Sequence, residues 1–350
     1  KIAKEVADSS NFDISVVKIS HLNAGIELNE ISFISSHLSN PNIPKEVKIR
    51  NTNLTYGNPN SLDADEFKPF LKLPIIFSSF SPSLVSHVGN PEKFYFGGIN
   101  LKHSSEIQFK RNLILSTEIN QPLYSNIVDT ISGPGSKMEH VRTDLVQYLK
   151  EDDIFISRAQ LDFIWSPMKE TYAKVSGGIF ENMYAGIGGE ILYKPFDKNY
   201  AISFELFEVK QRDFKQRFGF KEYKTTTGHL TYSYMFAKDV EVKLSYGRYL
   251  AKDDGFTLDF GRRTRSGFKT GFYFSRTNIS AELFGEGSFD KGFYIQIPLD
   301  LFSTQHIGEY STLKISPLTR DGGAKLIHDK DLRGLIHNSA RYELFKQWNG

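Results

Sequence analysis

Carboxylates are the first residues in this sequence whose chemistry could be catalytic. Asp253 and Asp254 are adjacent, and Glu205 and Glu241 lie elsewhere in the same half of the chain. Paired carboxylates on either side of a sugar bond are the machinery of glycoside hydrolases. Here the aspartates belong to the run Lys252–Gly255, and Asp-Gly is a signature of tight hairpin turns. The turn interpretation is favoured, and no catalytic residue is assigned.

Other motifs for metals, phosphates or acyl transfer are absent or incomplete. The nine histidines contain no HExxH pattern, and the sequence has no Gly-x-Ser-x-Gly elbow. The chain has no Cys, which excludes disulfides, thiolate metal sites and a catalytic thiol. Residues 285–288 are rich in Gly but lack the Gly-Lys-Ser/Thr ending of a phosphate-binding loop. The sequence therefore predicts no enzyme, no metal and no cofactor.

Charged residues gather in the second half of the chain. They are Arg212, Arg217, Arg248, Arg262, Arg263, Arg265, Arg276, Glu205, Glu241, Glu282 and Glu286. On the inner side of a barrel they would form a charged interior, which is normal for water-filled barrels. At strand ends they would belong to solvated loops. Both interpretations remain open from the sequence.

The elements that position these residues are short strands. Residues 240–247 alternate between apolar and polar side chains, and residues 268–275 and 293–297 repeat the pattern. A period of two places one set on each face of a sheet. Turn-forming residues separate the runs, at 237–239, 252–255, 276–278 and 288–292. An antiparallel meander of about 14 strands is expected, each near the roughly 9–11 residues that cross a bilayer obliquely.

This pattern predicts an all-β transmembrane antiparallel β-barrel. Alternation is shared with soluble sandwiches and lipocalin-like barrels. The 29 Phe and 17 Tyr, many at strand ends, favour the membrane barrel, whose interfaces carry aromatic girdles. A net charge of +2 does not indicate the strongly basic surface that nucleic-acid binding requires.

Four regions follow from the pattern. Residues 1–35 predict a small α+β element with a helix at 2–7, and residues 36–69, rich in Asn, Pro, Ser and Asp, predict a linker or loop. Residues 70–316 form the expected barrel, including strands at 144–150 and 279–284. Residues 317–350 form a C-terminal tail with a short helix at 339–347. Because the chain begins at Lys1 with neither an initiator Met nor a signal peptide, we expect a processed chain or a piece of a longer one.

Several segments, in order along the chain, resemble the YjbH/GfcD family of outer-membrane proteins linked to exopolysaccharide production and group 4 capsule. The most specific are Gly247–Asp253, Phe284–Gly292 and Pro317–Ala324. The others are Pro82–Leu84, Gly89–Tyr95, Val141–Asp144, Gly188–Pro195, Lys210–Phe214 and Thr227–Leu230. The resemblance covers roughly residues 70–326, and residues 1–35 look like the small periplasmic domain that precedes this barrel in the family.

The resemblance implies a bacterial outer-membrane barrel without catalytic residues, corresponding to the C-terminal half of longer family members. Its implied partners are membrane lipids, a polysaccharide, and envelope lipoproteins and periplasmic proteins of the same system, with no nucleic acid. The leading hypothesis is a barrel that helps to secrete or anchor exopolysaccharide or capsule. The alternative is a structural assembly platform for lipoprotein partners that never conducts glycan. An enzyme acting on the polysaccharide ranks last.

The alternation also assigns faces to individual residues. Val242, Leu244, Phe272, Phe274, Ile295 and Ile297 are expected to face lipid, and Glu241, Lys243, Tyr273 and Gln296 the lumen. Tyr273, Tyr294, Glu282 and Gln296 are the candidate residues for contact with glycan in the lumen. Residues 288–292 are expected to form a short hairpin turn in which Gly292 or a neighbour takes a positive φ.

Overall fold

The computed structural model covers the whole chain. It describes residues 14–24, 26–44, 51–56, 72–88, 95–126, 137–237, 239–264, 267–280, 289–298, 310–315 and 321–336, together with residues 5, 8, 9, 47, 48 and 283. Expectations for a helix at 2–7 and at 339–347 therefore fall mostly or wholly outside the described residues.

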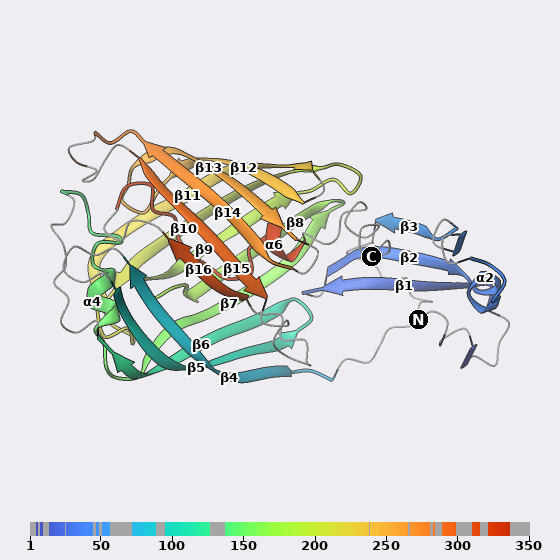
Figure 1. Cartoon of the computed structure of the whole chain (residues 1–350), viewed down its shortest axis with the longest axis horizontal. Helices are drawn as coiled ribbons and strands as arrows, with labels where there is room; N and C mark the ends of the chain where they lie inside the picture. Colours follow the sequence, from blue (N-terminus) through green and yellow to red (C-terminus); the bar gives the residue numbers. More distant parts are fainter. Residues whose placement is uncertain are drawn as a thin grey trace.

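Strands dominate the described residues (Figure 1). A small sheet contains β1 (Val16–Asn23), β2 (Ile26–Ile34) and β3 (Asn53–Tyr56). The large sheet contains β4 (Ile75–Val88), β5 (Tyr95–Lys110), β6 (Leu113–Ser125), β7 (Phe155–Met168), β8 (Thr171–Ile179), β9 (Tyr184–Tyr193), β10 (Tyr200–Arg212), β11 (Phe220–Ala237), β12 (Val240–Arg248), β13 (Asp254–Arg263), β14 (Lys269–Thr277), β15 (Asp290–Pro298) and β16 (Tyr310–Ile315).

The large sheet is a single antiparallel meander. Its 13 strands pair strictly in chain order from β4 to β16, one strand fewer than the sequence pattern suggests. The sheet rolls into a barrel, with β4 and β16 facing each other across the side nearest the viewer (Figure 1). Connections at the end near the small sheet are mostly short, such as 111–112 and 169–170. Those at the other end include the long segment 126–154. We call these the short-turn end and the long-loop end.

The wall is apolar outside and polar inside. Large apolar side chains on its outer face are about half exposed, for example Leu206 (50%), Leu244 (47%) and Phe272 (52%). Buried side chains of the same strands are charged or polar; they include Gln160, Asp162, Lys174, Ser176, Glu190, His229, Glu241, Ser245 and Ser275. A soluble barrel would bury the apolar set instead. The inverted distribution separates the two possibilities left open by alternation and is that of a transmembrane β-barrel.

Two expected strands are not formed. Residues 144–150 contain the helix α4 (Leu145–Leu149), whose Val146 and Tyr148 are buried. Alternation in so short a run is also compatible with one helical turn, so tertiary packing decided the outcome. Of the strand expected at 279–284, the described residues 279, 280 and 283 lie outside any strand. In the described part of the chain, no helix has the length and apolar character to cross a membrane.

The small sheet lies at the short-turn end of the barrel (Figure 1). Its strands β1 and β2 form a hairpin, the helix α2 (Ser35–Ser39) follows, and β3, from within the expected linker, pairs with β2. Ile26 and Leu28 at the start of β2 are buried against Ile164 and Leu192 of the barrel wall. The small sheet is thereby packed directly onto the barrel.

Candidate functional site: the barrel interior

The barrel interior contains a segment of the chain's own C-terminal region. Residues 321–336, which we call the interior segment, run from the long-loop end to the short-turn end. Their start packs with Phe207 and Val209 of β10, and their end packs with Ala201 at the opposite end of the same strand. The helix α6 (Leu332–Leu335) closes the segment and contacts β8 and β9. The lumen of the described barrel is therefore occupied along its length.

At the long-loop end, Asp321 anchors the interior segment. Its carboxylate accepts hydrogen bonds from the backbone N–H groups of Arg142 (2.7 Å) and Thr143 (2.9 Å), and from the Thr143 hydroxyl (2.9 Å). The Arg142 guanidinium donates to the carbonyl of Lys325 at 2.7 Å and forms an ion pair with Glu181 at 3.0 Å. Because Asp321 is fully buried, these bonds replace the water that it loses on folding.

Asp253, at the turn between β12 and β13, adds a second anchor. The turn is formed as expected, with Lys252 in the left-handed region at φ 67. Asp253 is not solvated, however: it is buried and accepts the backbone N–H of Gly323 at 2.8 Å. Asp254 instead pairs with Arg248 at 3.0 Å on the exposed side. The two carboxylates therefore serve separate partners, which supports the preference for the turn over a catalytic pair.

At mid-length, ionic and polar contacts bind the interior segment to the wall. Glu205 of β10 contacts His328 (Nε2 to Oε2, 3.2 Å) and His229 of β11 (Nδ1 to Oε1, 3.1 Å). Lys174 of β8 is buried and donates to the carbonyls of Asp329 and Lys330, each at 2.9 Å. The interior segment thus joins β8 and β10, two strands that do not pair with each other.

Charge also fixes Asp329. Arg158 of β7 lies 3.8 Å from its carboxylate and Lys330 lies 3.6 Å away. Lys330 also pairs with Glu106 of β5. The Asp329 carboxylate therefore lies between two cations, one from the wall and one from its own segment.

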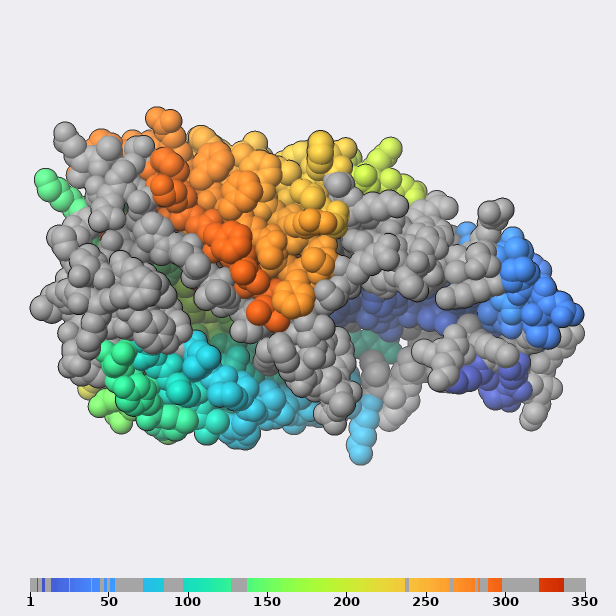
Figure 2. Space-filling model, viewed as in Figure 1, coloured from blue at the N-terminus to red at the C-terminus, as the bar shows by residue number. Residues whose placement is uncertain are grey.

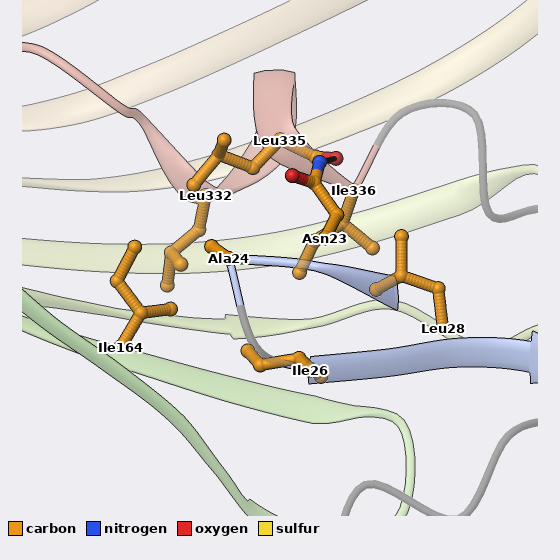
Figure 3. Close-up of a pocket in the computed structure, with 8 residues that line it drawn as sticks. All are labelled: Asn23, Ala24, Ile26, Leu28, Ile164, Leu332, Leu335 and Ile336. Carbon is orange, nitrogen blue, oxygen red and sulfur yellow. Dashed lines mark hydrogen bonds between the residues drawn. The ribbon is translucent and has the colours of Figure 1, made fainter. Parts of the chain in front are cut away.

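At the short-turn end, the interior segment meets the small sheet (Figure 3). The backbone N–H of Leu332 donates to Glu190 of β9 at 2.9 Å, and Arg333 pairs with Glu241 of β12. Asn23, at the tip of the β1–β2 hairpin, donates to the carbonyl of Leu335 at 2.8 Å. Figure 3 shows the hairpin tip between α6 and the wall, with Ile164 from β7 on the other side. One apolar cluster joins the small sheet, α6 and the wall.

The wall formed by β13, β14 and β15 has a different inner surface. Tyr294 faces inward and donates to Asp259 of β13 at 3.0 Å. Its ring lies over Gly271, where a Cβ would come within 2.4 Å of the ring. Lys269 lies 5.5 Å from the centre of that ring. The absence of side chains at glycine positions gives the ring room to lie against the wall.

Tyr273 repeats this arrangement. It is on the same face as buried Ser275 and pairs across strands with Gly292, whose Cβ would lie 2.5 Å from its ring. Gly292 is thus inside β15 and takes no positive φ, so the expectation of a turn there is wrong. The bulk of the tyrosine ring, not turn geometry, accounts for this glycine. Gln296, two residues beyond Tyr294, shares the inner face.

The sequence therefore placed Tyr273, Tyr294 and Gln296 on the correct face, and the structure brings the two tyrosines together on adjacent strands. Glu282 lies outside the described residues. Leu244 and Phe272 are outside and Glu241 inside, as expected. The arginines occupy both of the environments that the sequence leaves open. Arg212 is buried, whereas the side chains of Arg217, Arg248 and Arg262 are more than half exposed. Within the described residues, no His, Asp or Glu cluster is arranged to hold a metal ion.

The interior segment is what sequence reasoning missed. Residues 317–350 were expected to be a tail because their alternation is lost. Charges in the segment occur at odd and even positions alike, as in Lys325, His328 and Asp329. A lipid-facing strand cannot have charges on both faces, so this pattern excludes a strand of the wall. An exposed tail has the same pattern, and the sequence therefore gives no signal for burial inside the barrel.

One protein family matches nearly the whole chain. The YjbH family model, described as an exopolysaccharide biosynthesis protein, matches residues 6–338. The chain is 36% identical over 253 residues to the protein named "Uncharacterized lipoprotein YjbH" of Escherichia coli (strain K12), which covers 70% of this chain and 36% of that protein. The chain thus spans about a third of the length of this relative.

Solved structures give weaker matches. A loop L8 deletion mutant of OmpT, an outer membrane protein of Vibrio cholerae, aligns at 9% identity and a TM-score of 0.30, over 63% of this chain and 87% of that one. In-vitro folded OmpT of Vibrio cholerae aligns at 9% identity and a TM-score of 0.27, over 63% of this chain and 79% of that one. On the family match and the sequence identity to the E. coli protein, this chain belongs to the YjbH family of exopolysaccharide biosynthesis proteins.

Proposed function

We propose that this chain takes part in the secretion or anchoring of an exopolysaccharide as a plugged, non-catalytic barrel of the bacterial outer membrane. The observation that carries the proposal is the interior segment, which contacts strands from β5 to β12 through buried polar groups. A permanently open conduit would not need these contacts. The barrel at rest is closed, and passage of glycan requires the interior segment to move.

The tyrosine wall supports a role in holding glycan. We use this name for the inner surface made by Tyr273, Tyr294, Gln296 and Asp259. Aromatic rings that lie flat offer faces to the apolar sides of sugar rings, and carboxylate and amide groups bind sugar hydroxyls. In the interior segment, the side chain of Ile327 is 54% exposed. A hydrated glycan chain fits such a surface better than an apolar ligand does.

Orientation follows from the loops. In outer-membrane barrels the short turns are periplasmic and the long loops extracellular. The small sheet, packed at the short-turn end, therefore lies in the periplasm under this proposal. There it is available to envelope lipoproteins and periplasmic proteins of the same polysaccharide system, with neither nucleic acid nor a cofactor required.

A second candidate is an assembly platform that never conducts glycan. It is favoured by the direct packing of the small sheet on α6, which closes the periplasmic end of the lumen. In this version the barrel anchors the small sheet at the membrane, and the interior segment is a permanent structural core.

The two candidates differ in what the tyrosine wall does. Replacing Tyr273, Tyr294 and Glu282 together by Ala is expected to reduce surface polysaccharide at least several-fold at matched barrel abundance. The control replaces Phe272 and Phe293 by Ala, because these neighbours are exposed on the outer face. Full polysaccharide levels in the triple variant would rule out glycan contact at this wall and would favour the assembly platform.

A further inference from the structure

The two end strands of the large sheet have one open edge each. Within the described residues, β4 pairs only with β5 and β16 only with β15. Figure 1 shows the arrows of β4 and β16 on either side of the opening. In Figure 2 a hollow lies beside the cyan surface of β4 on the same face. We call this opening, bounded by β4 and β16, the seam.

The strand count prevents a simple closure of the seam. All 12 neighbour pairings are antiparallel, so strand direction alternates and β4 and β16 run the same way, both toward the long-loop end. Direct contact would create one parallel pair in an otherwise antiparallel wall. One further strand that runs from the long-loop end to the short-turn end would pair antiparallel with both edges. Unpaired edges do not occur in lipid, because no water satisfies their N–H and C=O groups.

The outer face of β4 is apolar. Ile76, Phe80 and Leu84 on that face are 60–72% exposed, in the same range as Ile187 (61%) and Tyr246 (65%) of the fully paired strands β9 and β12. A strand that continues the wall beyond β4 would therefore present apolar side chains on this face.

The chain's own segments do not meet the geometric requirement. The interior segment has the right direction, but its charges are matched inside the barrel by Glu205, Lys174 and Glu241. Residues 337–350 start at the short-turn end, so a single pass would run parallel to β4. Residues 57–74 begin and end at that same end, and 18 residues are too few for two passes of roughly 9–11 residues with a turn between them.

We propose that the seam accepts one β-strand from outside residues 1–350, antiparallel to both β4 and β16. This is strand addition to a sheet edge, in which backbone hydrogen bonds supply affinity and alternating side chains supply specificity. The donor strand has apolar residues on the face that continues Ile76 and Phe80. It has small or polar residues on the face that continues Ser79 and Ser81 of β4.

Pro82 defines where the donor strand pairs. Proline lacks an N–H donor and occurs in sheets at edges, so the ladder on the open side of β4 is interrupted near residue 82. The stretch Ile75–Ser81, nearer the short-turn end, is the continuous part of the acceptor edge. The donor strand therefore engages β4 chiefly over these residues.

The test uses a photo-crosslinking amino acid, p-benzoylphenylalanine, at Ile76 or Phe80 of the full chain in intact cells. Directly opposed side chains of neighbouring strands lie about 4.5–5.5 Å apart, within reach of the probe. Both positions are expected to crosslink to one segment from outside residues 1–350. Peptide mapping should find the Ile76 adduct about four residues C-terminal to the Phe80 adduct in that segment, the order that an antiparallel strand requires.

Phe272 is the matched control position, because it is also exposed on the outer face but has paired strands on both sides. The probe there should give no adduct with the donor segment. An adduct with residues 1–350 of a second copy would replace the proposal by self-association. Adducts to lipid alone, to the chain's own residues 1–350, or in parallel order would overturn the proposal.

Discussion

Two inner walls of this barrel come from the same alternating pattern and have different surfaces. On β7 to β12, buried Lys, Glu and Gln side chains bind the interior segment. On β13 to β15, two tyrosine rings lie over glycines beside Asp259. The first wall is a docking surface for the chain itself, whereas the second carries two aromatic rings with carboxylate and amide groups beside them. Alternation determines which side chains point inward. Whether the resulting surface binds the interior segment depends on the contacts that those side chains make with it.

Lys174 is expected to give the largest effect on the first wall. Lys174→Ala removes two hydrogen bonds to the interior segment and a cation 3.8 Å from Glu190, which is left buried without its lysine partner. Breaking a buried pair in this way costs about 3–5 kcal/mol. Urea unfolding of the purified barrel would measure the loss. Lys224→Ala, at an exposed pair with Glu208, should cost less than about 1 kcal/mol, and equal losses would contradict the first wall's role.

Asp321 tests the anchor at the long-loop end. Asp321→Ala leaves two backbone N–H groups and the Thr143 hydroxyl without their acceptor, at about 1–3 kcal/mol. Amide hydrogen exchange in residues 321–336 should accelerate, while exchange in β13 and β14 stays slow. Asp254→Ala is the control, because its carboxylate pairs with Arg248 on the exposed side. Unchanged exchange in the interior segment would show that Asp321 is not its anchor.

Gly271 tests the tyrosine wall. Gly271→Ala places a Cβ within 2.4 Å of the Tyr294 ring, so the ring must leave its position and the hydrogen bond to Asp259 is lost. We expect a loss of about 1–3 kcal/mol and faster iodination of Tyr294. Gly177→Ala should have little effect, because the new Cβ would lie 3.8 Å from its nearest neighbour, the carbonyl oxygen of Gly186. A harmless Gly271→Ala would mean that the ring does not depend on this glycine.

Asn23 should have the smallest effect, because it contributes one hydrogen bond between the small sheet and α6. Asn23→Ala is expected to cost about 1 kcal/mol and to speed exchange at α6 without affecting Asp321. Ser32→Ala removes a hydrogen bond within the small sheet and serves as the control. Equal exchange in both variants would show that the hairpin tip does not hold the interior segment.

Much of the wall was predictable because it depends on local pattern. The period of two placed Leu244 and Phe272 outside and Glu241 inside, and it put Tyr273 and Tyr294 on one face. Turn residues located the 249–253 connection. These properties need only the pleat of a strand and the backbone preferences of Asp, Lys and Gly, which neighbouring residues determine.

Tertiary structure alone decided what fills the barrel. Asp321 binds Arg142 and Thr143, and His328 binds Glu205, across more than 100 residues of chain. Alternation carries no information about such distant partners, so residues 321–336 read as a tail and 144–150 as a strand. Likewise, position 292 is a glycine because the Tyr273 ring on the neighbouring strand leaves no room for a Cβ, and not because of the backbone φ at that position. The local sequence determines whether a side chain points toward lipid or toward the lumen, whereas packing between distant segments determines which residues it contacts there.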